Sequence, residues 1–123
     1  MNGHHPRRHK HLVESFKDAI SGFILAFVQE RNIHIQIFAA VAVVIFSIII
    51  HVSPIELMIV FLLIGGVISL ELVNTAIERV VDLVTQEQHP MAKAAKDAAA
   101  AAVWWFSVVS VAVFIVIVVN KLT

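Results

Sequence analysis

The sequence contains no cysteine and no tyrosine, only 3 prolines and 4 glycines, and charged residues make up just 15% of its 123 positions. The absence of cysteine excludes disulfides, thiol nucleophiles and thiolate metal sites. The 9 basic and 9 acidic residues give a formal net charge of zero, so the chain offers no electrostatic field for nucleic acid. Composition therefore excludes thiol enzymes, thiolate metalloproteins and nucleic-acid-binding proteins.

Hydrophobic residues are plentiful. They make up 59% of the chain and give a mean hydropathy of +0.89, against about 45–50% apolar residues in soluble domains. A helix needs about 20 apolar residues to cross a hydrocarbon core of about 30 Å. Three runs meet this length, at 33–51, 54–72 and 98–119. The sequence predicts an all-α integral membrane protein with a single domain over residues 1–123.

Residues 12–29 predict a different kind of helix. Its apolar residues recur at helical spacing, and most of its polar residues fall on the other side, as in a helix that lies on a membrane surface. The apolar residues are Leu12, Phe16, Ala19, Ile20, Phe23 and Phe27. The alternative is an ordinary amphipathic helix packed on protein.

Basic residues predict the orientation in the membrane. Five precede the first crossing and three lie between the second and third, whereas Lys121 is the main basic residue on the opposite side. The eight are Arg7, Arg8, Lys10, Lys17, Arg31, Arg79, Lys93 and Lys96. By the positive-inside rule, the N-terminus and the 73–97 region are expected in the cytoplasm.

The segment 65–84, GGVISLELVNTAIERVVDLV, begins as an apolar helix and gains carboxylates with no proline to end it. At about 100° per residue, a stripe about 100° wide carries Glu71, Asn74, Thr75, Glu78 and Asp82. Ionisable groups at membrane depth are costly and usually functional, which makes Glu71 a candidate site residue. The residues farther along, taken alone, are interpreted as a solvated face: Arg79, Asp82 and Glu87.

Further charged residues lie near the ends of the other crossings, in QERN (29–32) and HPMAKAAKDAAAA (89–101). Carboxylates and an amide without cysteine suit Mg²⁺, which takes oxygen ligands and commonly bridges phosphates. Lysines there could contact phosphate oxygens. No GxxxxGK[ST] phosphate loop is present, and the pair Gly65-Gly66 lies in a crossing, where it favours close helix packing.

Three segments together resemble the prokaryotic diacylglycerol kinase and undecaprenol kinase family of small membrane enzymes. They are LELVNTAIERVVDLV, HPMAKAAKDAAAAAV and QERN, and the resemblance covers nearly the whole chain. It implies a homotrimer of three-crossing protomers in the bacterial cytoplasmic membrane, each with an N-terminal surface helix. It also implies Mg²⁺-dependent transfer of the γ-phosphoryl group of ATP to a lipid hydroxyl.

The resemblance assigns roles by position. Glu71 matches the general base, Asn74 a polar neighbour of the catalytic centre, and Glu30 and Glu78 the metal carboxylates. The residues matched to nucleotide binding are Asp18, Glu30, Glu78, Glu87, Gln88, His89, Lys96 and Asp97. The family's diacylglycerol-specific members carry a basic residue in the N-terminal helix that has no clear counterpart among His11, Lys17 and Asp18.

The lipid and the class of protein each have an alternative. The sequence of the two longer segments resembles Gram-positive undecaprenol kinases more than Gram-negative diacylglycerol kinases. Undecaprenol is therefore the expected acceptor, and diacylglycerol is the alternative. A small ion-coupled transporter would place its carboxylates near the bilayer midplane. Here the acids lie at the ends of the crossings, and a structural scaffold would leave the acidic stripe unexplained, so the sequence favours a lipid kinase.

Overall fold

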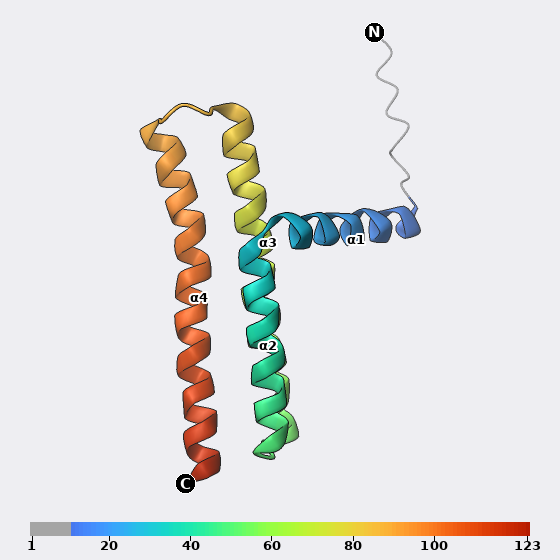
Figure 1. Ribbon diagram of the computed structural model, residues 1–123, viewed down its shortest axis with the longest axis vertical. Coiled ribbons are helices and arrows are strands. Elements are labelled where there is room, and N and C mark those ends of the chain that lie inside the picture. Colours follow the sequence, from blue (N-terminus) through green and yellow to red (C-terminus); the bar gives the residue numbers. More distant parts are fainter. Residues whose placement is uncertain (1–10) are drawn as a thin grey trace.

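The computed structural model describes residues 11–123, and the basic residues Arg7, Arg8 and Lys10 of the topology argument lie outside this part. The described residues form four helices in order: α1 (Leu12–Gln29), α2 (Arg31–Ile49), α3 (Pro54–Val84) and α4 (Pro90–Leu122). Figure 1 shows α2, α3 and α4 running alongside one another, with α1 lying crosswise to them. The predicted all-α class is confirmed, and a helix is present over 12–29.

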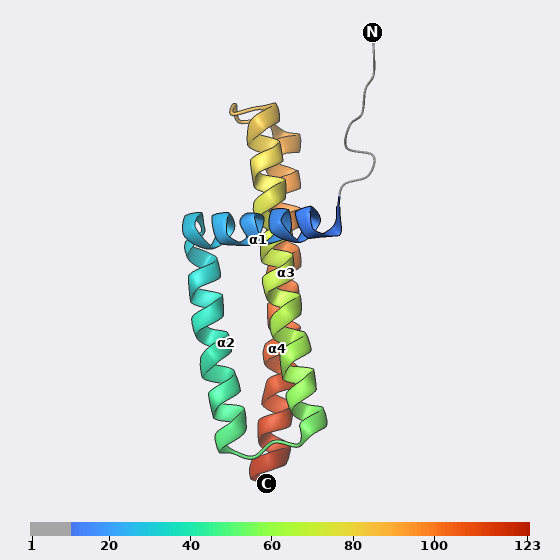
Figure 2. The same ribbon diagram turned by 90° about the vertical axis from the view of Figure 1, so that its right-hand side faces the viewer.

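Three helices, α2, α3 and α4, are long and apolar enough to cross a membrane by length and composition. The 31 residues of α3 and the 33 of α4 span about 46 Å and about 50 Å at 1.5 Å per residue, well beyond a hydrocarbon core of about 30 Å. Both helices therefore continue past the level of α1 before they join through residues 85–89 (Figures 1 and 2). The protein is a multi-pass membrane protein.

The end of α2 differs from the predicted crossing 33–51, because the helix stops at Ile49. His51 takes a left-handed backbone conformation with φ 59°. Its N–H donates to the carbonyl of Ile48 at 3.1 Å, and the N–H of Val52 donates to that of Ser47 at 3.2 Å. These bonds satisfy carbonyls at the end of α2 and turn the chain within a few residues.

The start of α3 is fixed by a capping box. Ser53 Oγ accepts a hydrogen bond from the Glu56 N–H at 3.1 Å, and the Ser53 N–H donates to Glu56 Oε1 at 2.9 Å. Pro54 occupies the first turn, where its missing N–H costs nothing. Glu56 thus has a structural role at the end of the bundle far from Glu71.

The elbow between α1 and α2 is formed by Glu30, the single residue between the two helices, in an extended conformation. Its N–H donates to the Ala26 carbonyl at 2.8 Å. His34 Nε2 contacts the carbonyl oxygen of Phe27, and the two rings lie 4.3 Å apart between centroids. Two α1 carbonyls and two aromatic rings therefore take part in the contacts at the elbow where α1 leaves the bundle.

The closest helix packing is between α3 and α4, which Figure 2 shows as a pair with α2 to one side. A Cβ added at Gly66 would lie 2.4 Å from the Phe106 ring, whereas one added at Gly65 would meet nothing within 4 Å. The packing role expected for the glycine pair is thus confirmed for Gly66. It allows the α4 aromatic ring to sit against the backbone of α3.

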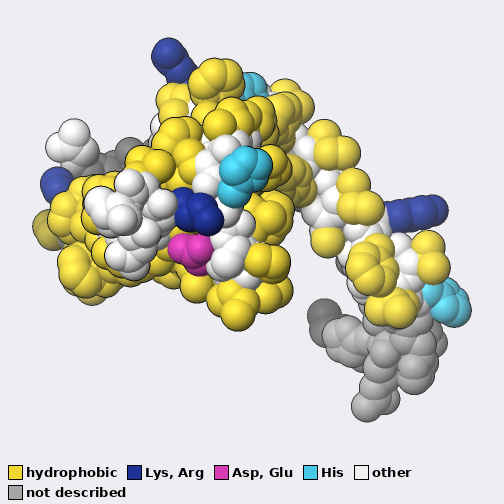
Figure 3. All heavy atoms as spheres, turned by 90° about the horizontal axis from the view of Figure 1, so that it is seen from below, with side chains coloured by type: hydrophobic (Ala, Val, Ile, Leu, Met, Phe, Trp, Pro, Cys, Tyr) yellow, Lys and Arg dark blue, Asp and Glu magenta, His cyan; other side chains and the backbone are white. Residues whose placement is uncertain are grey.

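Little of the chain is buried. Among the described residues the buried side chains comprise four apolar ones and four polar ones: Ala26, Ile33, Val60, Ile117, Ser47, Glu71, Asn74 and Thr75. Viewed from the end that carries the α2–α3 turn, the surface is mostly hydrophobic (Figure 3). This suits helices that face lipid, and it makes the buried polar residues of α3 exceptional.

Candidate active site

Glu71 lies inside α3 and is almost fully buried, with 4% of its surface exposed. The Nε2 group of Gln36, from α2, donates a hydrogen bond to Glu71 Oε2 at 3.1 Å. A hydrogen bond to a carboxylate offsets part of the cost of burying it. Glu71 is therefore held in one orientation where α2 meets α3, as a proton acceptor in catalysis must be.

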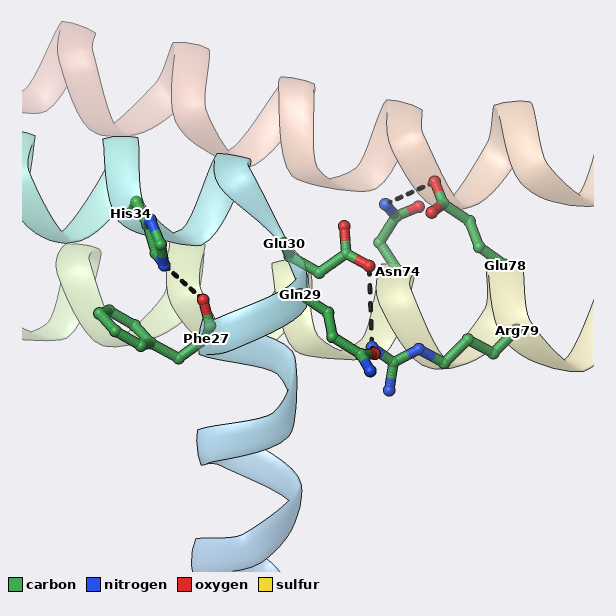
Figure 4. A network of polar contacts seen from close by, with 7 residues as sticks. All are labelled: Phe27, Gln29, Glu30, His34, Asn74, Glu78 and Arg79. Carbon is green, nitrogen blue, oxygen red and sulfur yellow. Dashed lines mark hydrogen bonds and ion pairs between the residues drawn. The ribbon is translucent and has the colours of Figure 1, made fainter.

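Buried polar atoms without a partner gather around Glu71. In the described part of the chain these are Gln36 Oε1, Asn74 Oδ1 and Thr75 Oγ1. The Nδ2 group of Asn74 donates a hydrogen bond to Glu78 Oε1 at 3.1 Å, and Asn74 Oδ1 remains without a partner (Figure 4). Since buried polar atoms are normally hydrogen-bonded, their clustering marks a place that a polar ligand would complete.

Glu30 approaches the same face of α3 from the elbow. Its Oε1 lies 3.8 Å from Arg79, whose guanidinium also donates to Gln29 Oε1 at 2.6 Å. Glu30 is the N-cap of α2, but its side chain makes no capping bond. In Figure 4 the side chains of Glu30 and Glu78 lie on either side of Asn74. The elbow therefore carries the Glu30 carboxylate to the polar stripe of α3.

This donor set fits a magnesium ion that arrives with phosphates. Within residues 11–123, no cluster of three or more His, Cys, Asp or Glu side chains could by itself hold a metal. Mg²⁺, however, is usually bound through one or two carboxylates together with substrate phosphates and water. The carboxylates of Glu30 and Glu78, with the unpartnered Asn74 oxygen, supply oxygen donors of this kind.

Lys96 and Asp97 lie near the start of α4, closer to the α3–α4 loop than Glu71 is. Lys96 Nζ contacts Asp82 Oδ1 at 2.5 Å, and Asp82 is one turn beyond Glu78 on the same stripe of α3. Asp97 instead pairs with Lys93 on its own helix, also at 2.5 Å, with both side chains exposed. Lys96 thus joins the stripe, whereas the described contacts of Asp97 stay on α4.

The loop residues Glu87, Gln88 and His89 connect α3 to α4 and are exposed. The Glu87 N–H donates to Thr85 Oγ1 at 3.2 Å, and His89 caps α4 by accepting from the Met91 N–H on Nδ1 at 3.1 Å. Capping through Nδ1 requires the proton on Nε2, so the outer ring nitrogen is a donor. The loop can present this group to an anion.

Asp18 is exposed on α1, twelve residues before Glu30. At 1.5 Å per residue this is about 18 Å along the helix, and α1 leads away from the bundle (Figure 1). The structure therefore does not bring Asp18 to Glu30, Glu71 and Glu78 within one chain.

Sequence reasoning missed three contacts. Gln36 is a lone amide in an apolar run, a signal that could have identified it, since polar groups in crossings are costly. Arg79 and Asp82 are exposed, as the solvated interpretation expected, but they also contact Glu30 and Lys96 respectively. Neither pairing has a local sequence signal, because each joins different helices.

Comparison with known proteins identifies the family. The sequence profile of the family described as prokaryotic diacylglycerol kinase matches residues 17–118. An undecaprenol kinase of Bacillus subtilis is 55% identical over 93 residues, which cover 76% of each chain. A Synechocystis diacylglycerol kinase is 42% identical over 83% of this chain and 59% of its own, and a Haemophilus influenzae diacylglycerol kinase is 31% identical over 76% and 80%. The chain belongs to the prokaryotic diacylglycerol kinase family and is a lipid kinase.

Proposed function

We propose that this protein transfers the γ-phosphoryl group of ATP to the hydroxyl of undecaprenol at the cytoplasmic face of a bacterial cell membrane. The observation that carries the proposal is the buried carboxylate of Glu71, held by Gln36 and surrounded by unpartnered polar atoms, at the point where an apolar helix becomes polar. A lipid keeps its tail in the bilayer and ATP comes from water. A helix that passes from the bilayer into water can contact both the lipid and ATP.

In the proposed reaction, Glu71 accepts the proton as the O–H bond of the lipid breaks and the hydroxyl oxygen bonds to the γ-phosphorus. The bond from that phosphorus to ADP breaks in the same displacement. Glu30 and Glu78 would hold Mg²⁺, which when bound neutralises charge on the phosphates. Asn74 orients Glu78 through its amide, and Gln36 keeps the Glu71 carboxylate in place.

Nucleotide contacts are assigned to the far part of the stripe. Lys96, already drawn to Asp82, carries a positive charge one turn beyond Glu78 and can pair with phosphate oxygens. Asp97 and the loop residues Glu87, Gln88 and His89 complete this proposed nucleotide site. Asp18 could join it only from the α1 of another protomer, because α1 of the same chain leads away.

The proposed assembly is a homotrimer with α1 on the cytoplasmic membrane surface. Supporting this, α1 leaves large apolar side chains exposed, with Leu12 at 73% and Phe16 at 62% of their full exposure. α2–α4 likewise bury only a few residues within one chain. Lipid and neighbouring protomers would cover these surfaces.

Diacylglycerol remains the second candidate substrate, favoured by the two relatives that are named diacylglycerol kinases. The direct test offers labelled ATP and Mg²⁺ to the detergent-purified protein with undecaprenol or diacylglycerol as acceptor. The proposal expects labelled undecaprenyl phosphate as the faster product. Faster labelling of diacylglycerol would make phosphatidic acid the product, and no labelling of either lipid would refute the proposal.

A further inference from the structure

A cavity of about 240 Å³ lies between α2, α3 and α4 and is lined almost wholly by apolar side chains. Its lining includes Gln36, Ala40, Val43, Val60, Ile64 and Phe114. On α2 it extends from Gln36 to Val43, about 10 Å along the helix. Its walls come from all three of the helices that can cross a membrane.

One end of the cavity lies at Gln36, the hydrogen-bond partner of the proposed catalytic carboxylate. Gln36 both lines it and donates to Glu71, and Ile68, which also lines it, precedes Glu71 by one turn. The buried Gln36 Oε1 has no partner in the described chain. A group that enters the cavity beside Gln36 therefore meets a polar end followed by hydrocarbon walls.

This order of polar and apolar groups matches one kind of lipid better than another. In a prenyl alcohol the carbons that follow the hydroxyl are hydrocarbon. In a diacylglycerol the neighbouring carbons carry ester carbonyls, which need hydrogen-bond donors when buried. Beyond Gln36, the side-chain polar atoms of the lining come only from Ser107 and Ser110, and Ser110 donates its hydroxyl to the Phe106 carbonyl at 2.7 Å.

We propose that this cavity selects the lipid: it holds the first hydrocarbon segment of a prenyl alcohol, with the hydroxyl at the Gln36 end, beside the hydrogen-bonded Gln36–Glu71 pair, and disfavours glycerolipids because it offers their esters almost no donors. The inference rests on the proposed function, because it concerns the acceptor of the same reaction. It adds that selectivity is set in the first few carbons beyond the hydroxyl, by the walls of α2, α3 and α4.

The chemical test compares three acceptors on the wild-type protein: undecaprenol, a 1,2-dialkylglycerol and a 1,2-diacylglycerol. The two glycerolipids have chains of equal length. The two glycerolipids share a hydroxyl, and the ether-linked one lacks carbonyls. kcat/KM should fall from undecaprenol to the dialkylglycerol, and again to the diacylglycerol by between about fivefold and a hundredfold, the usual effect of a buried unpaired polar group. Equal values for the two glycerolipids would overturn the inference.

The positional test uses a matched pair on α2. Ala40 lines the cavity, whereas Ala42 is exposed and does not. Ala40→Leu should raise KM for undecaprenol by about tenfold or more, as added bulk in a hydrocarbon pocket does, and leave KM for ATP unchanged. Ala42→Leu should leave both values unchanged.

Three results separate the possible failures. If Ala40→Leu behaves like Ala42→Leu while the wild type phosphorylates undecaprenol, the cavity does not hold the lipid and the proposed function stands. If Ala40→Leu alters the oligomer size in gel filtration, a second copy of the chain fills the cavity, and the inference is wrong. If the wild type phosphorylates none of the three lipids, the proposed function itself has failed.

Discussion

At the scale of single residues, the site depends on pairs that join different helices. Glu71 of α3 is held by Gln36 of α2, Glu30 of the elbow is approached by Arg79 of α3, and Lys96 of α4 contacts Asp82. The last two pairs are partly exposed, so each contributes little to stability. Their importance lies in where they place charge.

Glu78 and Asp82 provide a test of this placement. Glu78→Gln removes a proposed metal carboxylate and should weaken Mg²⁺-dependent ATP binding by more than about tenfold, with a strong loss of turnover. Asp82→Asn only releases Lys96 from a half-exposed pair and should change ATP affinity by a few-fold at most. Calorimetric titration of ATP with and without Mg²⁺ measures both effects.

Equal losses in the two variants would contradict this placement. They would mean that the stripe acts through its total negative charge rather than through a metal at Glu78. An Asp82→Glu variant, which keeps the charge, serves as the control for folding.

At the scale of helices, local signals fix the ends and one glycine fixes a contact. The capping box at Ser53 and the left-handed His51 set the α2–α3 turn, while Gly66 lets Phe106 approach α3. α3 has no proline after Pro54, so nothing interrupts it between lipid depth and the polar region.

The glycine pair gives a matched experiment. Gly66→Ala should lower the thermal unfolding midpoint in detergent, because the new methyl group collides with the Phe106 ring. Gly65→Ala meets nothing and should hold or raise the midpoint, since alanine favours a helix over glycine by up to about 1 kcal/mol. A midpoint for Gly66→Ala at or above that of Gly65→Ala would show that Phe106 adjusts without cost.

At the scale of the whole molecule, the sequence predicted the all-α membrane fold class better than it predicted the side-chain contacts between helices. Hydropathy identified three helices that can cross a membrane, and helical periodicity placed Glu71, Asn74 and Thr75 on one stripe, where these three side chains are buried. The helices α3 and α4 extend beyond the predicted crossings 54–72 and 98–119, because hydropathy ends where polar residues begin, while the helices continue. The Gln36–Glu71 bond spans 35 positions, and no local pattern encodes it.

Orientation in the membrane can be tested in whole cells. Residues 85–92 are expected in the cytoplasm, and the chain has no native cysteine, so Gln88→Cys introduces a single reporter. It should resist an impermeant thiol reagent applied to intact cells and react after permeabilisation. Labelling from outside intact cells would reverse the proposed topology.

The central claim, that Glu71 is the base of a lipid kinase, is tested most directly by Glu71→Gln. Glutamine keeps the size and the hydrogen-bonding capacity of the side chain but cannot take the proton of the lipid hydroxyl. Turnover with undecaprenol should fall by about 10²–10⁴-fold, while ATP·Mg²⁺ binding stays close to wild type because Glu30, Glu78 and Lys96 remain.

Both quantities are measured on the same detergent-purified variant, after gel filtration has shown an intact oligomer. A folded protein that binds ATP and is nearly inactive is the predicted result. Turnover above about a tenth of the wild-type value would remove Glu71 as the base. A loss of ATP binding as severe as the loss of turnover would make it a nucleotide-site or structural residue instead.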